Sequence, residues 1–348
     1  MKAVRLYRPR DIRFEEVEIP KIKANEVLIK VKATGACGSD IPRAMETGAH
    51  VSPVILGHEF AGQVEEVGKE VKDIKKNDRV TAYPLLPCYQ CEFCESGMYN
   101  LCNNYSYIGS RENGSFAEYI KLPVENILKL TNNIDYETGA TTDPATVALH
   151  GFRKARLNPG DKVAIIGAGA IGLFSLQWAK ILGARQVLVI DLFDEKLKIA
   201  EDLGADDLIN ANKRDVVKEV LNKTEGKGVD IVIESAGVKS SQAESLLIAN
   251  KLAKIVFIGI SHNGLQLDEK QVDNLLRKEL NIIGSWNSIN MSISIDEWRT
   301  ALHFMSIGQL RAKPLITHKF GFKDVRKAFE MMYNQSEIFI KVMFFPDF

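Results

Sequence analysis

The sequence predicts an α/β protein with two kinds of domain, a β-rich region and a doubly wound parallel sheet. Three observations lead to this prediction. The chain has 348 residues, which is enough for about two domains of ~150 residues each. Frequent glycines divide residues 1–150 into short strand-like segments. After residue 160, apolar runs of strand length alternate with amphipathic segments of helix length.

The composition is that of an ordinary globular protein without a strong charge. Apolar residues make up 45% of the chain, and 45 Lys and Arg balance 45 Asp and Glu. The apolar content excludes a disordered, collagenous or coiled-coil chain. Zero net charge removes the long-range field that would gather nucleic acid or anionic lipid. We therefore expect neither nucleic acid nor a membrane as a partner.

Neither an export signal nor a membrane span is expected from the sequence. Charges are scattered through residues 1–20, where a signal peptide needs an apolar core. The uncharged run at 163–179 contains three glycines and is shorter than the ~20 residues of a typical membrane span. A cytoplasmic protein is therefore expected. Thiols stay reduced in the cytoplasm, so disulfides among the five cysteines are not expected.

The N-terminal region is predicted to be mostly β. Residues 26–32 alternate partly between apolar and polar side chains, as in a half-buried strand. Turns between further short strands are indicated by the glycines that follow, at positions 35, 38, 48, 57, 62 and 68. We predict that residues 1–150 form this domain.

The middle of the chain is predicted to form the parallel sheet. Apolar runs occur at 163–166, 187–190, 230–233 and 255–258. Parallel strands that are covered by helices on both faces have such continuous apolar runs. The first helix is expected over 171–182, where Gly183 ends it.

The C-terminal part has a mixed pattern. A helix is expected over 324–333 and a last strand over 338–345. Because this strand needs partners, residues 286–348 are expected to return to the first domain, which leaves 151–285 as the central domain.

The turn after the first parallel strand carries a nucleotide-binding fingerprint. It reads Gly167-Ala168-Gly169-Ala170-Ile171-Gly172, which fits G-x-G-x-x-G. These glycines would let helix amides approach a pyrophosphate, although glycines in such a turn can also serve tight packing alone. Asp191 follows Gly172 by 19 residues, near the ~20 expected for the acid that binds the adenosine ribose. Its charge would repel a 2′-phosphate, so NAD is predicted rather than NADP.

Four of the five cysteines form a compact cluster with the spacing C-x2-C-x2-C-x7-C, at Cys88, Cys91, Cys94 and Cys102. Four thiolates this close suit a closed tetrahedral zinc site, which is structural because it leaves no open position. An iron–sulfur cluster more often has three residues before its last ligand and a proline after it, whereas here the gap is seven. Four unrelated buried thiols are the other alternative.

The fifth cysteine lies in a separate motif. Cys37 belongs to GACGSD at 35–40, and His58 and Glu59 belong to GHEFAG at 57–62. The second segment is not the zinc-protease motif H-E-x-x-H, because position 62 is glycine. Taken alone, Cys37 could be a small buried thiol instead of a metal ligand.

Together with the pair Asp143-Pro144, these motifs resemble in order and spacing those of the zinc-dependent medium-chain alcohol and polyol dehydrogenases. The resemblance extends over essentially the whole chain. It implies a GroES-like catalytic domain built from both ends of the chain, a central Rossmann domain, and an active site between the two. It also implies a homodimer or a homotetramer.

The same resemblance implies a catalytic zinc ion held by Cys37 and His58. A carboxylate completes the protein ligands, and either Glu59 or Asp143 can supply it. The polyol branch of the family usually has Glu where this chain has Asp143, and the shorter side chain can bind through water or leave Glu59 as the ligand. Asp143 can alternatively cap the helix that follows it.

The implied reaction is oxidation of an alcohol with hydride transfer to NAD. Zinc acts in this family as a Lewis acid that lowers the pKa of the alcohol. Ser39 matches the hydroxyl that takes the alcohol proton, so the expected catalytic set is Cys37, Ser39, His58 and Glu59. Lys196 matches a lysine near the adenosine ribose, although it can also be an ordinary exposed helix residue.

Secondary motifs, which include CGSDIPR at 37–43, YIGSR at 107–111 and IGSW at 283–286, are similar to those of family members that act on sugar-alcohol phosphates. They imply oxidation of a secondary alcohol to a ketone, most specifically of galactitol 1-phosphate to tagatose 6-phosphate. A phosphate needs cations, and the candidates are Arg43 and Arg111, with His50 as a weaker one. Both arginines could instead be solvated or ion-paired.

Two other functions use the same residues. A dehydrogenase could act on an unphosphorylated polyol such as sorbitol or L-iditol, or on threonine. A zinc regulator that binds NAD without turnover would also need these cysteines and glycines.

Overall fold

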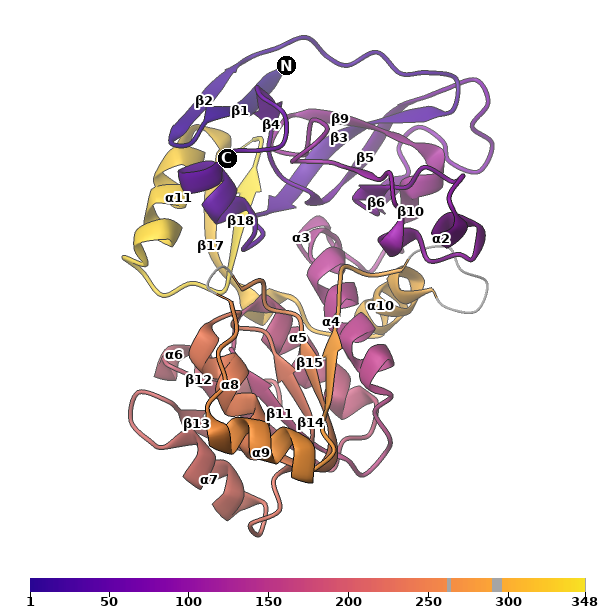
Figure 1. Cartoon of the computed structure of the whole chain (residues 1–348). Coiled ribbons are helices and arrows are strands. Elements are labelled where there is room, and N and C mark those ends of the chain that lie inside the picture. Colours follow the sequence, from indigo (N-terminus) through magenta and orange to yellow (C-terminus); the bar gives the residue numbers. More distant parts are fainter. Residues whose placement is uncertain (262–263, 290–295, 348) are drawn as a thin grey trace. The chain divides into compact units, whose positions relative to one another are not determined.

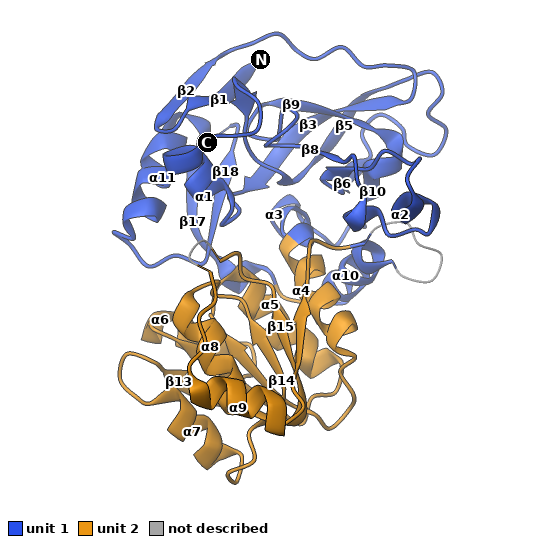
Figure 2. Ribbon diagram, viewed as in Figure 1, with its two compact units in different colours: residues 1–143, 289–308, 312–348 blue, residues 144–288, 309–311 orange. Residues whose placement is uncertain are grey.

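The computed structural model describes residues 1–261, 264–289 and 296–347, and it divides into two compact units (Figures 1 and 2). Unit 1 comprises Met1–Asp143, Ile289–Gly308 and Ala312–Phe348, and unit 2 comprises Pro144–Ser288 and Gln309–Arg311. The predicted fold class is confirmed, because unit 1 is rich in β structure and unit 2 contains a parallel sheet flanked by helices. The sequence predicts domain boundaries after residues 150 and 285.

The sheet of unit 2 contains six parallel strands within the described residues. Their spatial order is β13 (Asp207–Asn210), β12 (Gln186–Asp191), β11 (Lys162–Ile166), β14 (Val229–Glu234), β15 (Ala249–Phe257) and β16 (Asn281–Gly284). The order reverses between β11 and β14, and ligands of such sheets bind at the carboxyl ends of the strands at this point. All four predicted apolar runs lie largely within these strands.

Helices cover this sheet in unit 2 (Figure 1). They are α5 (Ala170–Ile181), α6 (Asp194–Asp202), α7 (Val216–Lys223), α8 (Lys239–Ile248) and α9 (Glu269–Arg277). Val220 of α7 and Leu246 of α8 belong to one core cluster with Ala164 and Leu188 of the sheet. The helix predicted over 171–182 is α5, and Gly183 follows it with a φ of +90°.

Unit 1 contains a seven-stranded sheet within the described ranges. Its path runs through β10 (Ile127–Lys129), β6 (Arg79–Ala82), β5 (Glu59–Val67), β3 (Glu26–Gly35), β18 (Lys341–Phe345) and β17 (Ile316–Gly321), and β9 (Tyr119–Pro123) also pairs with β3. The last strand of the chain thus pairs antiparallel with β3 near the N-terminus. This pairing brings the two ends of the chain together at the site described below.

Smaller elements complete unit 1. β2 (Asp11–Glu16), β1 (Lys2–Arg8) and β4 (Val54–Ile55) form a small sheet, and β7 (Leu85–Leu86) pairs with β8 (Ser106–Tyr107). The helices are α1 (Asp40–Pro42), α2 (Glu92–Glu95), α3 (Tyr136–Ala140), α10 (Glu297–Ser306) and α11 (Val325–Asn334). The π-helical turn η1 (Arg43–Thr47) follows α1, and short 3-10 turns cover η2 (Tyr99–Leu101), η3 (Val124–Asn126), η4 (Lys313–Leu315) and η5 (Phe322–Asp324). Helix α4 (Thr142–Ala155) begins in unit 1 and continues in unit 2.

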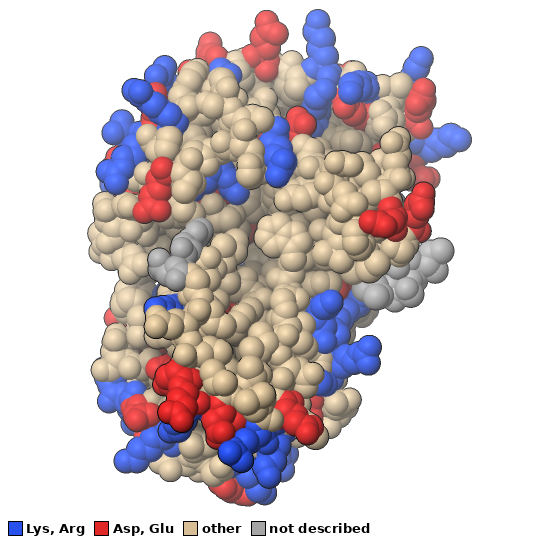
Figure 3. All heavy atoms as spheres, viewed as in Figure 1, with Lys and Arg blue, Asp and Glu red and all other residues tan. Residues whose placement is uncertain are grey.

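Basic and acidic side chains are intermixed on the face shown in Figure 3, in agreement with the zero net charge. Across the described ranges, the helices are too short or too polar for any of them to cross a membrane.

Candidate active site

Antiparallel pairing of β3 with β5 assembles a candidate metal centre in unit 1. Gly35 at the end of β3 lies opposite Glu59 at the start of β5. Cys37 follows β3 by two residues and His58 precedes β5 by one, so the register brings their side chains together. The ligand atoms of Cys37, His58 and Glu59 all lie within 4.8 Å of one another.

The chemistry of these residues fits a zinc ion. A sulfur, an imidazole nitrogen and a carboxylate oxygen are the ligand types of zinc, and three protein ligands leave a position open for substrate. His58 is buried, and its Nδ1 makes no hydrogen bond with any described residue. The nearest acid, Asp40, has its Oδ1 3.8 Å from this nitrogen. A carboxylate behind the imidazole is typical of histidines that bind metals.

Asp40 connects this group to Arg43. Its Oδ2 accepts a hydrogen bond of 3.1 Å from the backbone N–H of Cys37, and its Oδ1 accepts one of 2.8 Å from Arg43 Nη1. Burial by itself lowers the pKa of His58, but the charges of Asp40 and Cys37 outweigh it and raise that pKa to about 10. The buried Asp40 therefore stabilises positive charge at the centre.

Lys341 of β18 pairs with Glu59. Its Nζ lies 2.5 Å from Glu59 Oε2 and donates a 3.0 Å hydrogen bond to the carbonyl of Ala36. Both charged side chains are buried. Burial lowers the pKa of Lys341, but the charge of Glu59 more than compensates, and the pKa is raised. The ion pair fixes the Glu59 carboxylate beside Cys37 and His58.

Asp143 lies in the first turn of α4, which begins at Thr142, and does not precede the helix as a cap would. It is buried, and burial, reinforced by the charge of Glu59, raises its pKa to about 7 against the opposing charge of His58. Asp143 is therefore within electrostatic reach of the centre. It is not part of the group whose ligand atoms lie within 4.8 Å of one another.

Two further side chains border the centre. Ser39 Oγ donates a 3.3 Å hydrogen bond to Cys37 Sγ. The ring of Tyr107 meets His58 edge-on, with 5.3 Å between the ring centroids. Burial and the charges of Asp143 and Cys37 raise the pKa of Tyr107, so its hydroxyl stays protonated.

Two of the predicted phosphate residues, Arg43 and Arg111, are within electrostatic reach of the third, His50. Burial lowers the pKa of His50, and the positive charges of Arg111 and Arg43 lower it further. His50 and Arg111 are exposed, and the Arg111 guanidinium lies 5.0 Å from the centroid of the Tyr105 ring. Arg43 is ion-paired with Asp40, one of the two alternatives that the sequence left open.

The four-cysteine segment forms a second candidate metal centre. The sulfurs of Cys88, Cys91, Cys94 and Cys102 lie within 4.8 Å of one another. Backbone amides, that of Asn103 first, lower the pKa of Cys91 to about 6, whereas burial raises that of Cys94 to about 12. A divalent ion would favour the thiolate form of all four sulfurs. The donor set fits a closed zinc site.

The nucleotide fingerprint in unit 2 forms the turn from β11 into α5. Gly167 has a φ of +99°, which favours glycine, and Gly169 precedes α5. A Cβ atom on Gly172 would lie 1.8 Å from the carbonyl oxygen of Gly167, so only glycine fits there. Ala168, Ala170 and Ile171 occupy the remaining positions of the turn and the first residues of α5. This geometry leaves helix amides open to a pyrophosphate.

Asp191 ends β12 beside this turn. The backbone N–H of Ala168 donates a 2.7 Å hydrogen bond to Asp191 Oδ2, and that of Phe193 donates one of 3.1 Å to Oδ1. Lys196 lies in the first turn of α6, where its Nζ is 5.3 Å from the centroid of the Phe193 ring. Asp191 thus connects the fingerprint turn to the end of β12.

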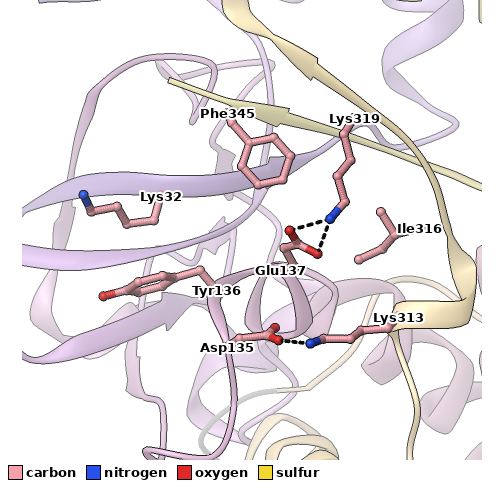
Figure 4. A pocket seen from close by; sticks show the side chains of 8 residues that line it. All are labelled: Lys32, Asp135, Tyr136, Glu137, Lys313, Ile316, Lys319 and Phe345. Carbon is pink, nitrogen blue, oxygen red and sulfur yellow. Dashed lines mark hydrogen bonds and ion pairs between the residues drawn. The ribbon is translucent and has the colours of Figure 1, made fainter. Parts of the chain in front are cut away.

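A separate pocket of about 540 Å³ lies between α3 and β17 in unit 1 (Figure 4). Two ion pairs line it, Lys319 with Glu137 and Lys313 with Asp135. None of the predicted site residues is among its lining residues.

Sequence reasoning did not assign Asp40, Lys341 or Tyr107 to the site. Asp40 lies in the same motif as Cys37, and an acid next to a presumed metal ligand could have indicated its role. A lysine within the apolar segment KVMFF was a signal of a buried ion pair. The contact of Tyr107 with His58 had no signal in the sequence, because only the fold brings the two rings together.

Family profiles match both units. The profile of the alcohol dehydrogenase GroES-like domain matches residues 23–132, and that of the zinc-binding dehydrogenases matches residues 170–306. Galactitol 1-phosphate 5-dehydrogenase of Escherichia coli K12 is 38% identical over 318 residues, which cover 91% of this chain and 92% of that protein. Sorbitol dehydrogenase of Bacillus subtilis is 31% identical, and the alignment covers 100% of this chain and 98% of that protein.

Solved structures agree with these matches. The crystal structure of galactitol-1-phosphate dehydrogenase from Escherichia coli has a TM-score of 0.93 and 36% identity, and the alignment covers 99% of this chain and 100% of that one. A zinc-binding dehydrogenase from Sinorhizobium meliloti bound to NADP has a TM-score of 0.91 and 31% identity, with 99% of each chain covered. The chain therefore belongs to the zinc-dependent medium-chain alcohol and polyol dehydrogenases. It is an oxidoreductase that uses zinc and a nicotinamide dinucleotide, as the sequence predicted.

Proposed function

We propose that this enzyme oxidises a secondary alcohol of a sugar-alcohol phosphate to the ketone with NAD as the hydride acceptor. Galactitol 1-phosphate, giving tagatose 6-phosphate, is the proposed substrate. The main support for this proposal is that hydrogen bonds connect the candidate metal centre to cationic side chains. Asp40 contacts Cys37 and Arg43, and the charges of Arg43 and Arg111 both act on His50.

This arrangement supports recognition of an anion close to the reacting carbon. Guanidinium groups bind phosphate through two parallel hydrogen bonds. Arg111 is exposed and is stacked on Tyr105, so we assign it the direct phosphate contact. Arg43 is held by Asp40, and its remaining N–H groups would add a second cation. The similarity to galactitol 1-phosphate 5-dehydrogenase supports the same substrate class.

We propose that Cys37, His58 and Glu59 hold the catalytic zinc ion. Glu59 is preferred to Asp143 because it belongs to the close group of ligand atoms. When bound, zinc supplies Lewis acidity that lowers the pKa of the substrate alcohol, and NAD accepts the hydride. The four cysteines from Cys88 to Cys102 would hold a second, structural ion.

The chain's own groups would then orient the alcohol and remove its proton. Ser39 Oγ lies beside the Cys37 sulfur, which puts a hydroxyl within reach of an alcohol at the centre. We assign Ser39 as the first acceptor of the alcohol proton, which it can pass on by donating its own. Tyr107 stays protonated, so its hydroxyl can donate a hydrogen bond to the substrate oxygen. Lys341 holds the Glu59 carboxylate in place through their ion pair.

We propose NAD as the preferred cofactor, although a related structure contains NADP. Both carboxylate oxygens of Asp191 face backbone amides near the predicted ribose position. A 2′-phosphate there would meet a negative charge. Lys196 lies nearby over the Phe193 ring, and we assign it a contact with the adenosine ribose.

We also propose that the protein is a homodimer or homotetramer. β16 is an edge strand of the unit 2 sheet, and Ile282 on it is 40% exposed. Leu276 and Trp286 beside it in sequence are also exposed. An exposed apolar sheet edge of this kind offers a surface on which another chain can pair. Light scattering coupled to size exclusion would measure the assembly directly.

A substrate panel tests the proposed reaction. NADH formation would be followed at 340 nm with galactitol 1-phosphate, galactitol, sorbitol, L-iditol and threonine. We expect kcat/KM for the phosphate ester to exceed that for galactitol at least tenfold. Equal values for galactitol and its phosphate would reject the phosphate site and favour the second candidate, a dehydrogenase of free polyols, which the similarity to sorbitol dehydrogenase supports.

A further inference from the structure

The short turn at 235–237 in unit 2 lies directly against the nucleotide fingerprint. β11 and β14 are parallel neighbours, and Ile166 lies opposite Glu234. The chain leaving β14 therefore runs beside the chain leaving β11. Ser235 Oγ donates hydrogen bonds of 3.0 Å to the carbonyl of Ile166 and 3.1 Å to that of Gly167.

The contact between this turn and the fingerprint is tight. A Cβ atom on Gly167 would lie 3.1 Å from both the backbone nitrogen of Ala236 and Ser235 Oγ. One on Gly172 would lie 3.0 Å from the same Ser235 oxygen. Any movement of the turn must therefore move the backbone of Gly167 or open a gap beside it.

A buried carboxylate holds the turn. Glu234 is 0% exposed, and its Oε1 accepts three hydrogen bonds: 3.0 Å from the N–H of Ala236, 2.9 Å from that of Gly237 and 2.8 Å from Ser241 Oγ. The backbone carbonyl of Glu234 accepts two more, from the N–H groups of Ile258 and Gly259. One residue thus ties the turn to α8 and to the end of β15.

The second oxygen of the Glu234 carboxylate, Oε2, does not bind the turn. Glu234 Oε2 is buried and accepts no hydrogen bond from a described residue. Burial raises the pKa of Glu234, and hydrogen bonding from Ser241, from the turn and from the side chain of Gln242 opposes that shift. Burying a carboxylate costs free energy, so packing alone is a poor reason for a glutamate at this buried position. Two of the three donors to Oε1 are backbone N–H groups of the turn. Glu234 is therefore placed to fix the conformation of the turn.

We propose that Glu234 is a positioning residue for the dinucleotide site, because it fixes the turn 235–237 against Gly167 and thereby sets the backbone that receives the pyrophosphate. Phosphate binding to backbone amides depends strongly on their placement. The inference rests on the proposed binding of NAD by unit 2. It predicts that the loss of Glu234 weakens the cofactor more than it slows the chemical step.

The test compares three variants in the full-length, zinc-loaded enzyme. Glu234→Ala removes the acceptor, and Glu234→Gln retains one carbonyl oxygen for the three donors. Glu201→Ala, at an exposed position on α6, is the matched control. We expect E234A to raise the Kd for NADH and the KM for NAD at least tenfold, with kcat within threefold. E234Q should restore both constants to within threefold of wild type, and E201A should change neither.

A purely structural role would give a different result. If E234A lowers the melting temperature but leaves the Kd and KM unchanged, the inference is wrong. Should E234A not fold, Ser235→Ala provides the second measurement, because it removes only the hydroxyl hydrogen bonds from the turn to Ile166 and Gly167. The hydrogen bond from the Ser235 backbone N–H to the Ile166 carbonyl remains. It should raise the Kd for NADH at least threefold, and an unchanged Kd would overturn the inference. Failure of wild-type protein to bind NADH would instead refute the proposed function.

Discussion

Lys341 and Glu59 form a buried ion pair with 2.5 Å between Nζ and Oε2, although they are 282 positions apart in the sequence. The pair joins the first residue of β18 to the first residue of β5, and Glu59 of β5 is part of the candidate metal centre. Removing one partner of a buried pair leaves the other charge without compensation, which typically costs about 3–5 kcal/mol. Stability of unit 1 and the shape of its centre therefore depend on the same contact.

Lys341→Met should lower the free energy of unfolding by about 3 kcal/mol, measured by urea denaturation. Lys319→Met is a matched control, because Lys319 pairs with Glu137 at the surface and such pairs contribute about 0–1 kcal/mol. The double variant K341M/E59Q should lose less stability than K341M. A K341M protein as stable as the control would contradict the assigned role of the pair.

The third zinc ligand can be identified by metal analysis. Glu59 belongs to the close group of ligand atoms and Asp143 does not. Glu59→Gln should therefore lose about one equivalent of zinc per chain after dialysis against a mild chelator, whereas Asp143→Asn should retain it. Both substitutions preserve side-chain size. The reverse pattern, with zinc kept by E59Q and lost by D143N, would identify Asp143 as the ligand.

Arg111 and Arg43 should respond differently to substitution. Arg111→Ala should raise the KM for galactitol 1-phosphate at least tenfold and leave kcat/KM for galactitol within twofold, because the lost contact is to the phosphate. Arg43→Ala should also lower kcat, because it frees Asp40 beside the metal ligands. Arg326→Ala, an exposed position on α11, is the control. A uniform loss on both substrates for R111A would argue against a phosphate contact.

Asp191 should govern the choice between NAD and NADP. Asp191→Asn keeps one acceptor oxygen, for the backbone N–H of either Ala168 or Phe193, but removes the charge. We expect kcat/KM for NADP to rise at least tenfold relative to that for NAD, because repulsion of the 2′-phosphate is lost. Steady-state kinetics with both cofactors measures this ratio. An unchanged ratio would show that another group selects the cofactor.

Local patterns were sufficient to predict much of the protein. The parallel strands could be predicted because buried strands need continuous apolar runs, and α5 because Gly183 ends it. The four-cysteine segment and the fingerprint before α5 could be recognised as well. In each of them, the residues that bind the ligand are close together in the sequence. The short strands β13 and β16 and the π-helical turn η1 had no comparable signal.

The amino-acid sequence alone thus determined the fold class, the family, and the segments that could bind zinc and a dinucleotide, because each depends on spacing along one stretch of chain. Only the tertiary structure decided what surrounds those segments. The pairing of Lys341 with Glu59, the link from Asp40 to Arg43, the edge contact of Tyr107 with His58 and the Glu234 anchor arise from strand register and packing. Such contacts join residues that are not recognisable as partners from sequence, since folding alone makes them neighbours.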